Sequence, residues 1–324
     1  MTPPSKRILV LGATGVIGKV LVDALVRAGD AFDTIGLFTS PDTVARKKEL
    51  IDSFVSRGVV VRTGDIDADE DVLEAYKDFD TVVSAVGRNA IEKQVRLIDL
   101  AAHRAPSIVR FLPSEFGTDI DYCAASAAEI PHQKKRRVRA CLAGQTSLAY
   151  SFVVTGPFAD LFIGNLPAEP RVGSFDLVTR TAFLAAPDGP VGLTTMADVG
   201  RALVAVLHHP DVCDGRAVYV HSFVTTPATI LAEFERQTAS SNAAAAWTVH
   251  HTTLSQLRDI EQDARAHAAP LADLFTLRRI WAEGGTLYDH MDNEAIGLTS
   301  TDSLEDVVHA AVERPVAAFQ SGEL

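Results

Sequence analysis

The sequence of 324 residues contains no apolar run of the 18 residues that a membrane-spanning helix needs. Its three cysteines, Cys123, Cys141 and Cys213, are odd in number and widely spaced, which excludes a disulfide framework and a cysteine metal motif. Basic residues are scarce, with 30 Lys and Arg against 42 Asp and Glu. The resulting charge of −12 disfavours nucleic acid and anionic membranes as partners. We therefore expect a cytoplasmic protein that has no such partner and no metal site.

Enough apolar sequence is present for a large core. Apolar residues make up 47% and charged residues 22%, which excludes a disordered or fibrous chain. Over the first part of the chain, continuous apolar segments alternate with segments of helical periodicity. Strands are predicted at residues 8–11, 34–38, 58–62, 81–86, 108–112 and 149–154, and helices at 44–54, 72–76, 95–102 and 138–143. Repeated βα units predict an α/β fold with a doubly wound parallel Rossmann sheet.

Two regions are predicted. Residues 1–156 form the nucleotide-binding Rossmann domain, and the βα rhythm ends after Pro157 in a stretch rich in Pro and Gly. Residues 157–324 then form a smaller C-terminal α/β substrate-binding region, although residues from about 190 to 222 are candidates to return to the first domain. Predicted helices of this region span residues 199–207, 230–234, 254–260 and 304–312.

The glycines Gly12, Gly15 and Gly18 follow the first predicted strand, and a helical pattern follows them. Glycines at such a turn permit the turn itself, the approach of backbone N–H groups to a pyrophosphate, and close packing of helix on strand. This context favours dinucleotide binding over a plain βα turn. The second predicted strand ends at Thr39 without the carboxylate of an NAD site, and the basic run 46–48 follows, so NADP is favoured. Asp42 lies nearby and weakens that preference.

The basic run 134–139 contains the leading candidate for acid–base chemistry. Spacing of 100° per residue places Lys135 on one stripe with Val138, Arg139 and Leu142, so Lys135 is expected to point inward. A lysine near apolar surface and other cations has a lowered pKa and can exchange a proton. The alternative is a solvated basic helix start. No tyrosine has a lysine four residues later, which excludes the usual short-chain dehydrogenase pair.

Several motifs together resemble one family. They are the glycine loop 12–18, Gly64-Asp65, the segments 84–87 and 110–117, Lys135 with Val138 and Arg139, and the segments 157–160 and 197–200. The combination is similar to the isoflavone reductase-like proteins, which include phenylcoumaran benzylic ether and pinoresinol-lariciresinol reductases, within the NmrA-like atypical short-chain dehydrogenases. The resemblance covers nearly the whole chain.

This resemblance implies that Lys135 is the catalytic lysine, that Arg139 contacts cofactor or substrate, and that Lys47 helps to bind the 2′-phosphate of NADPH. The substrate-contacting candidates are Ser114, Phe116 and Phe162. Thr39 stands where the family commonly has arginine, His132 replaces a phenylalanine, and Gly156 replaces an asparagine near the nicotinamide. The implied cofactor-binding residues are Gly12, Ala13, Thr14, Gly15, Val16, Ile17, Gly18, Thr39, Lys47, Ala85, Val86, Arg139, Pro157 and Phe158.

Three functions remain open at this point. The leading hypothesis is an NADPH-dependent reductase of a small aromatic, phenolic or polyketide-type secondary metabolite, with Lys135 as general acid or base. A second is an NmrA-like sensor that binds NADP(H) without catalysis, although Lys135 argues against it. A third is a redox-neutral isomerase or cyclase on the same fold. The expected partner is the small-molecule substrate, and homodimer formation is left open.

Overall fold

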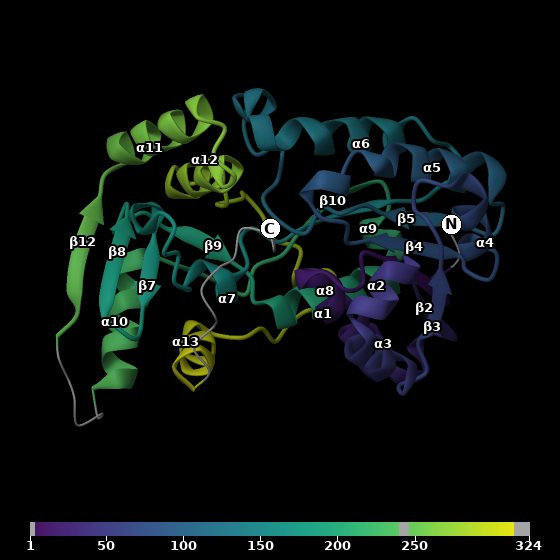
Figure 1. The fold of residues 1–324 in the computed structure, drawn as a ribbon, viewed down its shortest axis with the longest axis horizontal. Coiled ribbons are helices and arrows are strands. Elements are labelled where there is room, and N and C mark those ends of the chain that lie inside the picture. Colours follow the sequence, from purple (N-terminus) through teal and green to yellow (C-terminus); the bar gives the residue numbers. More distant parts are fainter. Residues whose placement is uncertain (1–3, 240–245, 314–324) are drawn as a thin grey trace.

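The computed structural model describes residues 4–239 and 246–313 (Figure 1). Five parallel strands form the central sheet in the order β3-β2-β1-β4-β5. A parallel bridge from Arg110 to Ala149 leads on to β6, which pairs in parallel with β10. The doubly wound α/β fold is thereby confirmed. The bounds are β1 Arg7–Leu11, β2 Thr34–Thr39, β3 Val60–Thr63, β4 Thr81–Ser84, β5 Arg110–Leu112, β6 Ser151–Val154 and β10 Arg216–Tyr219.

Helices cover both faces of this sheet, and Figure 1 shows α5 and α6 on one side and α1, α3 and α8 on the other. The apolar residues 8–11 of β1 are buried because both faces are covered. Helices α1 and α8 pack closely, since a Cβ at Gly200 would lie 2.8 Å from Ala24 Cβ. The bounds are α1 Val16–Arg27, α2 Pro41–Arg46, α3 Lys48–Val55, α4 Asp69–Tyr76, α5 Lys93–Arg104, α6 Gln133–Ala143, α8 Met196–His208 and α9 Pro210–Cys213. Short 3-10 helices span Gly29–Ala31, Arg88–Ala90, Ser126–Ala128, Ile130–His132 and Pro170–Val172.

The predicted helix 44–54 is in fact two helices, α2 and α3, which meet at Lys47. Helix α2 starts earlier because Ser40 accepts a hydrogen bond from the Thr43 N–H and Pro41 occupies the first turn. Lys47 then leaves the helical conformation, with φ −116° and ψ 36°. The prediction of one continuous helix was wrong. The break falls at Lys47, whose side chain reaches the Thr14 carbonyl oxygen.

The second region builds its own core. Strand β8 lies between β7, which is antiparallel to it, and β12, which is parallel to it, while β9 pairs with β11. Helix α10 packs on β8, and α11 packs on α12. The four predicted helices are present, whereas α12 and the three-stranded sheet were not predicted. The bounds are β7 Ser174–Asp176, β8 Thr181–Ala185, β9 Val191–Leu193, β11 Phe223–Thr225, β12 Thr248–Thr252, α7 Ala159–Phe162, α10 Pro227–Thr238, α11 Leu254–Ala266, α12 Ala272–Ala282 and α13 Leu304–Glu313.

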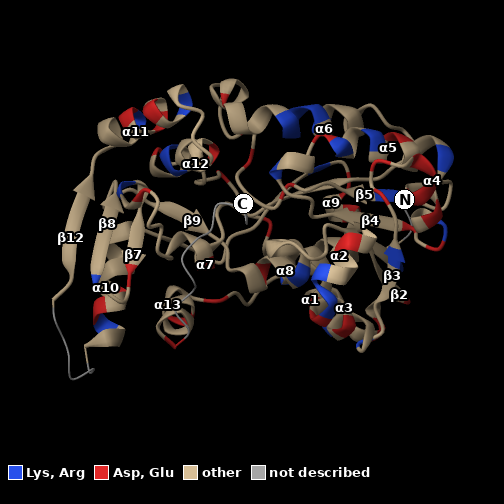
Figure 2. Cartoon of the chain, in the orientation of Figure 1, with Lys and Arg blue, Asp and Glu red and all other residues tan. Residues whose placement is uncertain are grey.

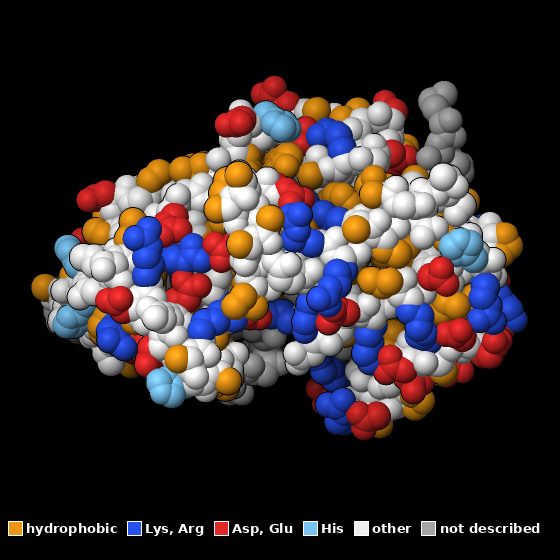
Figure 3. Space-filling view, turned by 90° about the horizontal axis from the view of Figure 1, so that it is seen from above, with side chains coloured by type: hydrophobic (Ala, Val, Ile, Leu, Met, Phe, Trp, Pro, Cys, Tyr) orange, Lys and Arg blue, Asp and Glu red, His pale blue; other side chains and the backbone are white. Residues whose placement is uncertain are grey.

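Segments of residues 190–222 lie against the first region, because β10 pairs with β6 and α8 packs on α1. The division after residue 156 stays a prediction. Within residues 4–239 and 246–313, no helix has the length and hydropathy needed to cross a membrane. Positive and negative side chains are interspersed along the chain and over the face seen from above (Figures 2 and 3).

Candidate active site

The glycine loop is a tight turn at the carboxyl end of β1. Gly12 has φ +75°, and a Cβ there would lie 2.5 Å from the Ala85 carbonyl oxygen. The loop therefore lies directly against the segment that holds Ala85 and Val86. A Cβ at Gly18 would lie 2.1 Å from the Gly12 carbonyl oxygen, so only glycine lets α1 pack this closely on the turn. The exposed Gly15 begins α1 without a capping side chain, which leaves backbone N–H groups of the first turn available to a ligand.

Lys47 reaches back to this loop. Its ammonium group donates a hydrogen bond of 2.8 Å to the Thr14 carbonyl oxygen. Arg46 instead pairs with Asp42 at 2.7 Å, and Lys48 pairs with Asp52. Of the three cations in the run 46–48, only Lys47 thus faces the glycine loop. Asp42, the residue that weakened the preference for NADP, is engaged by Arg46.

Lys135 points inward, as its helical stripe predicts. Its Nζ donates a hydrogen bond of 2.5 Å to the Glu115 carbonyl oxygen and lies 3.9 Å from the Glu115 carboxylate. The side chain as a whole is 21% exposed, so it is largely shielded from solvent. Burial lowers the pKa of Lys135, the Glu115 carboxylate partly opposes this shift, and the Arg139 charge lowers the pKa further. These contacts hold the Lys135 amine beside the loop that follows β5, and its acid–base role stays a prediction.

Arg139 is held by carboxylates. Its guanidinium makes two hydrogen bonds of 3.1 Å to Glu115 and one of 2.9 Å to Asp119, and it also contacts Asp121. Burial disfavours the charge of Arg139, but Glu115 and Asp119 raise its pKa overall. Four of its five N–H donors are used in this way, so Arg139 holds the side chains of Glu115 and Asp119 in place. Its contact with cofactor or substrate stays a prediction.

Ser114 and Phe116 lie in the loop after β5 that also holds Glu115. The Ser114 hydroxyl donates to the Val86 carbonyl oxygen at 2.9 Å, and its N–H donates to Gln94 at 2.8 Å. Phe116 is buried in the core cluster that includes residues of β1, α1 and α8. These contacts fix the loop beside Val86. Contact of either residue with substrate stays a prediction.

The segment after β6 crosses the same edge of the sheet. The backbones of Thr155 and Gly156 both donate to the Gly117 carbonyl oxygen at 3.0 Å, and a Cβ at Gly117 would lie 3.8 Å from Lys135 Nζ. The following residues are held by Thr194, whose N–H donates to the Pro157 carbonyl oxygen at 3.2 Å and whose carbonyl oxygen accepts the Ala159 N–H at 2.8 Å. The predicted cofactor and catalytic residues therefore meet along one edge, whereas Phe162 lies further on, in a pocket with Trp281.

The sequence did not reveal a group of aromatic residues that contacts Asp119, in the loop that follows β5. The Tyr219 hydroxyl donates to the Asp119 carboxylate at 3.1 Å, and the Tyr288 hydroxyl accepts the Asp119 N–H at 3.0 Å. His221 packs beside Tyr288 in a niche formed by Gly192 and Gly156, where a Cβ at Gly192 would lie 2.0 Å from its ring. Burial lowers the pKa of His221 to about 4. No spacing in the sequence brings these residues together.

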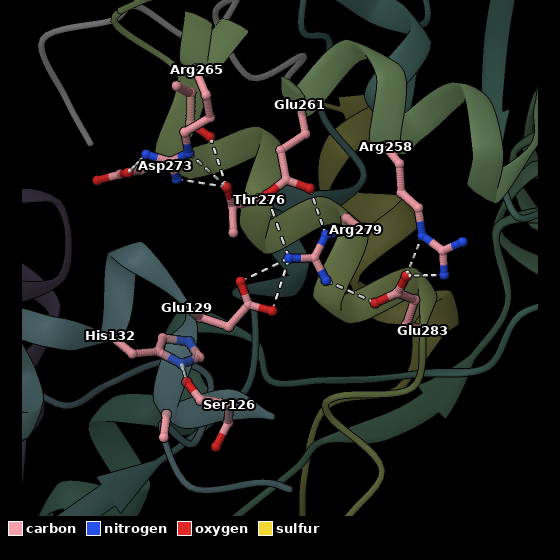
Figure 4. Close-up of polar contacts among 12 residues, drawn as sticks. Ser126, Glu129, His132, Arg258, Glu261, Arg265, Asp273, Thr276, Arg279 and Glu283 are labelled. Carbon is pink, nitrogen blue, oxygen red and sulfur yellow. Dashed lines mark hydrogen bonds and ion pairs between the residues drawn. The ribbon is translucent and has the colours of Figure 1, made fainter. Parts of the chain in front are cut away.

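A second network ties the segment before α6 to α12 (Figure 4). Arg279 pairs with Glu129, Glu261 and Glu283 at 2.5 to 2.8 Å. His132 lies next to this segment, with Nδ1 3.1 Å from the Ser126 carbonyl oxygen, and burial lowers its pKa. Among the described residues, no group of three or more His, Cys, Asp and Glu side chains is arranged to hold a metal ion.

Comparison with known proteins agrees with this architecture. A sequence profile of the NmrA-like family matches residues 4–270. The chain belongs to the NmrA-like family. Within it, isoflavone reductase of Cicer arietinum is 32% identical over 68% of this chain and 72% of its own length, which confirms the resemblance to isoflavone reductase-like proteins. Isoflavone reductase homolog A622 of Nicotiana tabacum is 39% identical, but over 49% of this chain and only 51%, about half, of its own length.

A solved structure with the same fold extends the comparison. Leucoanthocyanidin reductase of Vitis vinifera, in a binary complex with NADPH, superposes with a TM-score of 0.77. The two chains are 18% identical, and the superposition covers 95% of this chain and 100% of the other. At this identity the likeness concerns the fold, which extends through both regions of the NmrA-like chain.

Proposed function

We propose that the protein is an NADPH-dependent reductase of a small aromatic, phenolic or polyketide-type metabolite, with Lys135 as general acid or base. The observation that carries this proposal is the shielded Lys135 amine at the sheet edge to which the glycine loop also belongs. The relatives named as isoflavone reductases and the fold shared with an NADPH complex support the same conclusion.

The residues at the sheet edge fit NADPH. Gly12 and Gly18 permit the tight turn that a pyrophosphate-binding loop requires, and the exposed Gly15 leaves the start of α1 open to solvent. Strand β2 ends at Thr39, so no carboxylate there opposes a 2′-phosphate, and Lys47 supplies a positive charge beside the loop. The bound cofactor would supply a hydride from nicotinamide C4 to an electron-poor carbon of the substrate.

The protein supplies the matching proton. Lys135 would donate from Nζ to the substrate oxygen that gains negative charge as the carbon is reduced. The Glu115 carbonyl oxygen holds the ammonium in place, while Arg139 holds the Glu115 side chain. A lowered pKa makes Lys135 a better proton donor than an ordinary lysine. The side chains of the second region would exclude water and orient the substrate.

The test is NADPH consumption with a panel of lignan, isoflavonoid and polyketide-type compounds, followed at the reduced nicotinamide absorption band. With a compound that is turned over, Lys135→Met should lower kcat by about 10²- to 10⁴-fold, because the proton donor is lost. NADPH affinity should not change. Lys134→Met removes an exposed neighbouring lysine and is the matched control, with kcat close to that of the unmodified protein.

Other outcomes would contradict the proposal. NADPH binding without turnover of any compound would favour a sensor, and conversion of a compound without loss of NADPH would favour an isomerase or cyclase. Full kcat in the Lys135→Met variant would exclude Lys135 from the chemistry.

A further inference from the structure

Helix α12 carries two adjacent arginines in opposite surroundings. Arg279 is neutralised by three glutamates (Figure 4). Arg278 is 7% exposed and has no carboxylate partner among the described residues. A buried guanidinium without a counter-charge is costly, because the charge loses its hydration without a matching ion pair.

The contacts that Arg278 does make are weak. Its two terminal nitrogens lie 3.3 and 3.4 Å from the Phe162 carbonyl oxygen, and Nε has no hydrogen-bond partner. The guanidinium carbon lies 4.4 Å from the centre of the Phe162 ring and 5.6 Å from that of Trp281. These ring contacts offset part of the free-energy cost of removing the guanidinium from water. Burial lowers the pKa of Arg278 to about 10, so the group is still positive at neutral pH.

Among the described residues, Arg278 is the only charged one that lines a narrow pocket of the second region. The pocket is small and partly open to solvent, and the space in it that a water-sized sphere can occupy is about 20 Å³. Phe162, Phe175 and Trp281 are among its apolar walls. Gly173, with φ +112°, packs against the guanidinium, since a Cβ there would lie 3.2 Å from Nη1. An apolar pocket with one fixed positive charge suits an apolar ligand with one negative end.

The pocket also lies close to the catalytic loop. The Trp281 indole N–H donates to the Thr118 hydroxyl at 2.7 Å, and Thr118 follows Gly117, the residue beside the Lys135 amine. Phe162 ends α7, which begins directly after Phe158 at the sheet edge. Two wall residues of the pocket are therefore tied to the proposed reaction site, Trp281 through Thr118 and Phe162 through α7.

We infer that this pocket binds the carboxylate of an acidic substrate, with Arg278 as its partner and the aromatic walls around its apolar body. Guanidinium and carboxylate match as two parallel hydrogen bonds, which a neutral amide cannot reproduce. That the ligand is a substrate rests on the proposed function; that the pocket selects a carboxylate does not.

The experiment compares 3-phenylpropanoate with 3-phenylpropanamide, which has nearly the same shape and no charge. The chain has two tryptophans, so Trp247→Phe leaves Trp281 in the pocket wall as the sole fluorescent reporter. Titration at neutral pH should show the acid binding at least about tenfold more tightly than the amide, since a charge-assisted pair replaces a neutral contact. Adding Arg278→Met should abolish this preference, and Arg278→Lys should retain part of it.

Arg236→Met is the matched control, because it removes an exposed arginine of the same region and should leave the preference intact. Equal affinity for acid and amide, a preference that survives Arg278→Met, or no binding of either probe would overturn the inference. If Arg278→Met does not fold, the acid–amide comparison and Arg278→Lys still decide. The titration uses no NADPH, so it tests the pocket separately from the reaction. If the acid binds while no compound of the panel consumes NADPH, the proposed function is refuted and the carboxylate pocket still stands.

Discussion

The two regions of the molecule treat buried positive charge differently. In the first region, Arg110 pairs with Asp214 and Arg139 pairs with Glu115 and Asp119. In the second region, Arg278 is equally buried and has only rings and one carbonyl oxygen around it. The first arrangement completes a charge network within the protein and so fixes the loop around Lys135. The second leaves a buried charge without a carboxylate partner among the described residues, and we propose that a ligand supplies one.

Of the changes that test this contrast, removal of Arg139 should lower the free energy of unfolding most. Arg139→Met would leave the buried carboxylates of Glu115 and Asp119 without their partner, and breaking a buried ion pair costs about 3–5 kcal/mol. The free energy of unfolding, measured in urea, should fall by that amount. Arg136→Met is the control on the same helix, and its more exposed pair with Asp121 should contribute less than about 1 kcal/mol. Similar losses in both variants would contradict the distinction.

A smaller effect should come from His221, which lies where the two regions meet and is kept neutral rather than paired. Burial lowers its pKa to about 4, whereas the unfolded side chain binds a proton near 6.5. As the pH falls from about 6.5 to 4, the unfolded state binds a proton that the folded state does not bind, so the free energy of unfolding decreases. The loss should approach about 3 kcal/mol at pH 4.

The measurement is urea unfolding at pH 7 and pH 4 for the unmodified protein and for His221→Gln. The variant lacks the titrating group, so its stability should fall less over this range. An identical pH dependence in both proteins would show that the imidazole is protonated in the folded state.

The smallest effect on stability should come from Arg278→Met. No carboxylate loses its partner, and methionine replaces a costly buried charge with an apolar side chain, so the free energy of unfolding should change by less than about 1 kcal/mol. Urea unfolding at pH 7 measures this change. A loss near that of Arg139→Met would mean that Arg278 has a structural role like that of Arg139, and the contrast between the regions would disappear.

Much of the first region was predictable because its signals are local. Buried parallel strands are continuous apolar runs, and the glycine loop follows the first of them. The inward direction of Lys135 followed from helical periodicity within α6. The break at Lys47 was missed because it depends on how α2 is capped, and apolar spacing does not report that.

The sequence alone determined the βα order, the glycine loop and the family, since each rests on motifs that are local in the chain. Tertiary structure decided the rest. Arg278 and Arg279 are neighbours in sequence, yet one meets Glu129, Glu261 and Glu283 and the other meets Phe162 and Trp281. Which charges are neutralised depends on contacts between distant segments, and periodicity within a single helix carries no information about them.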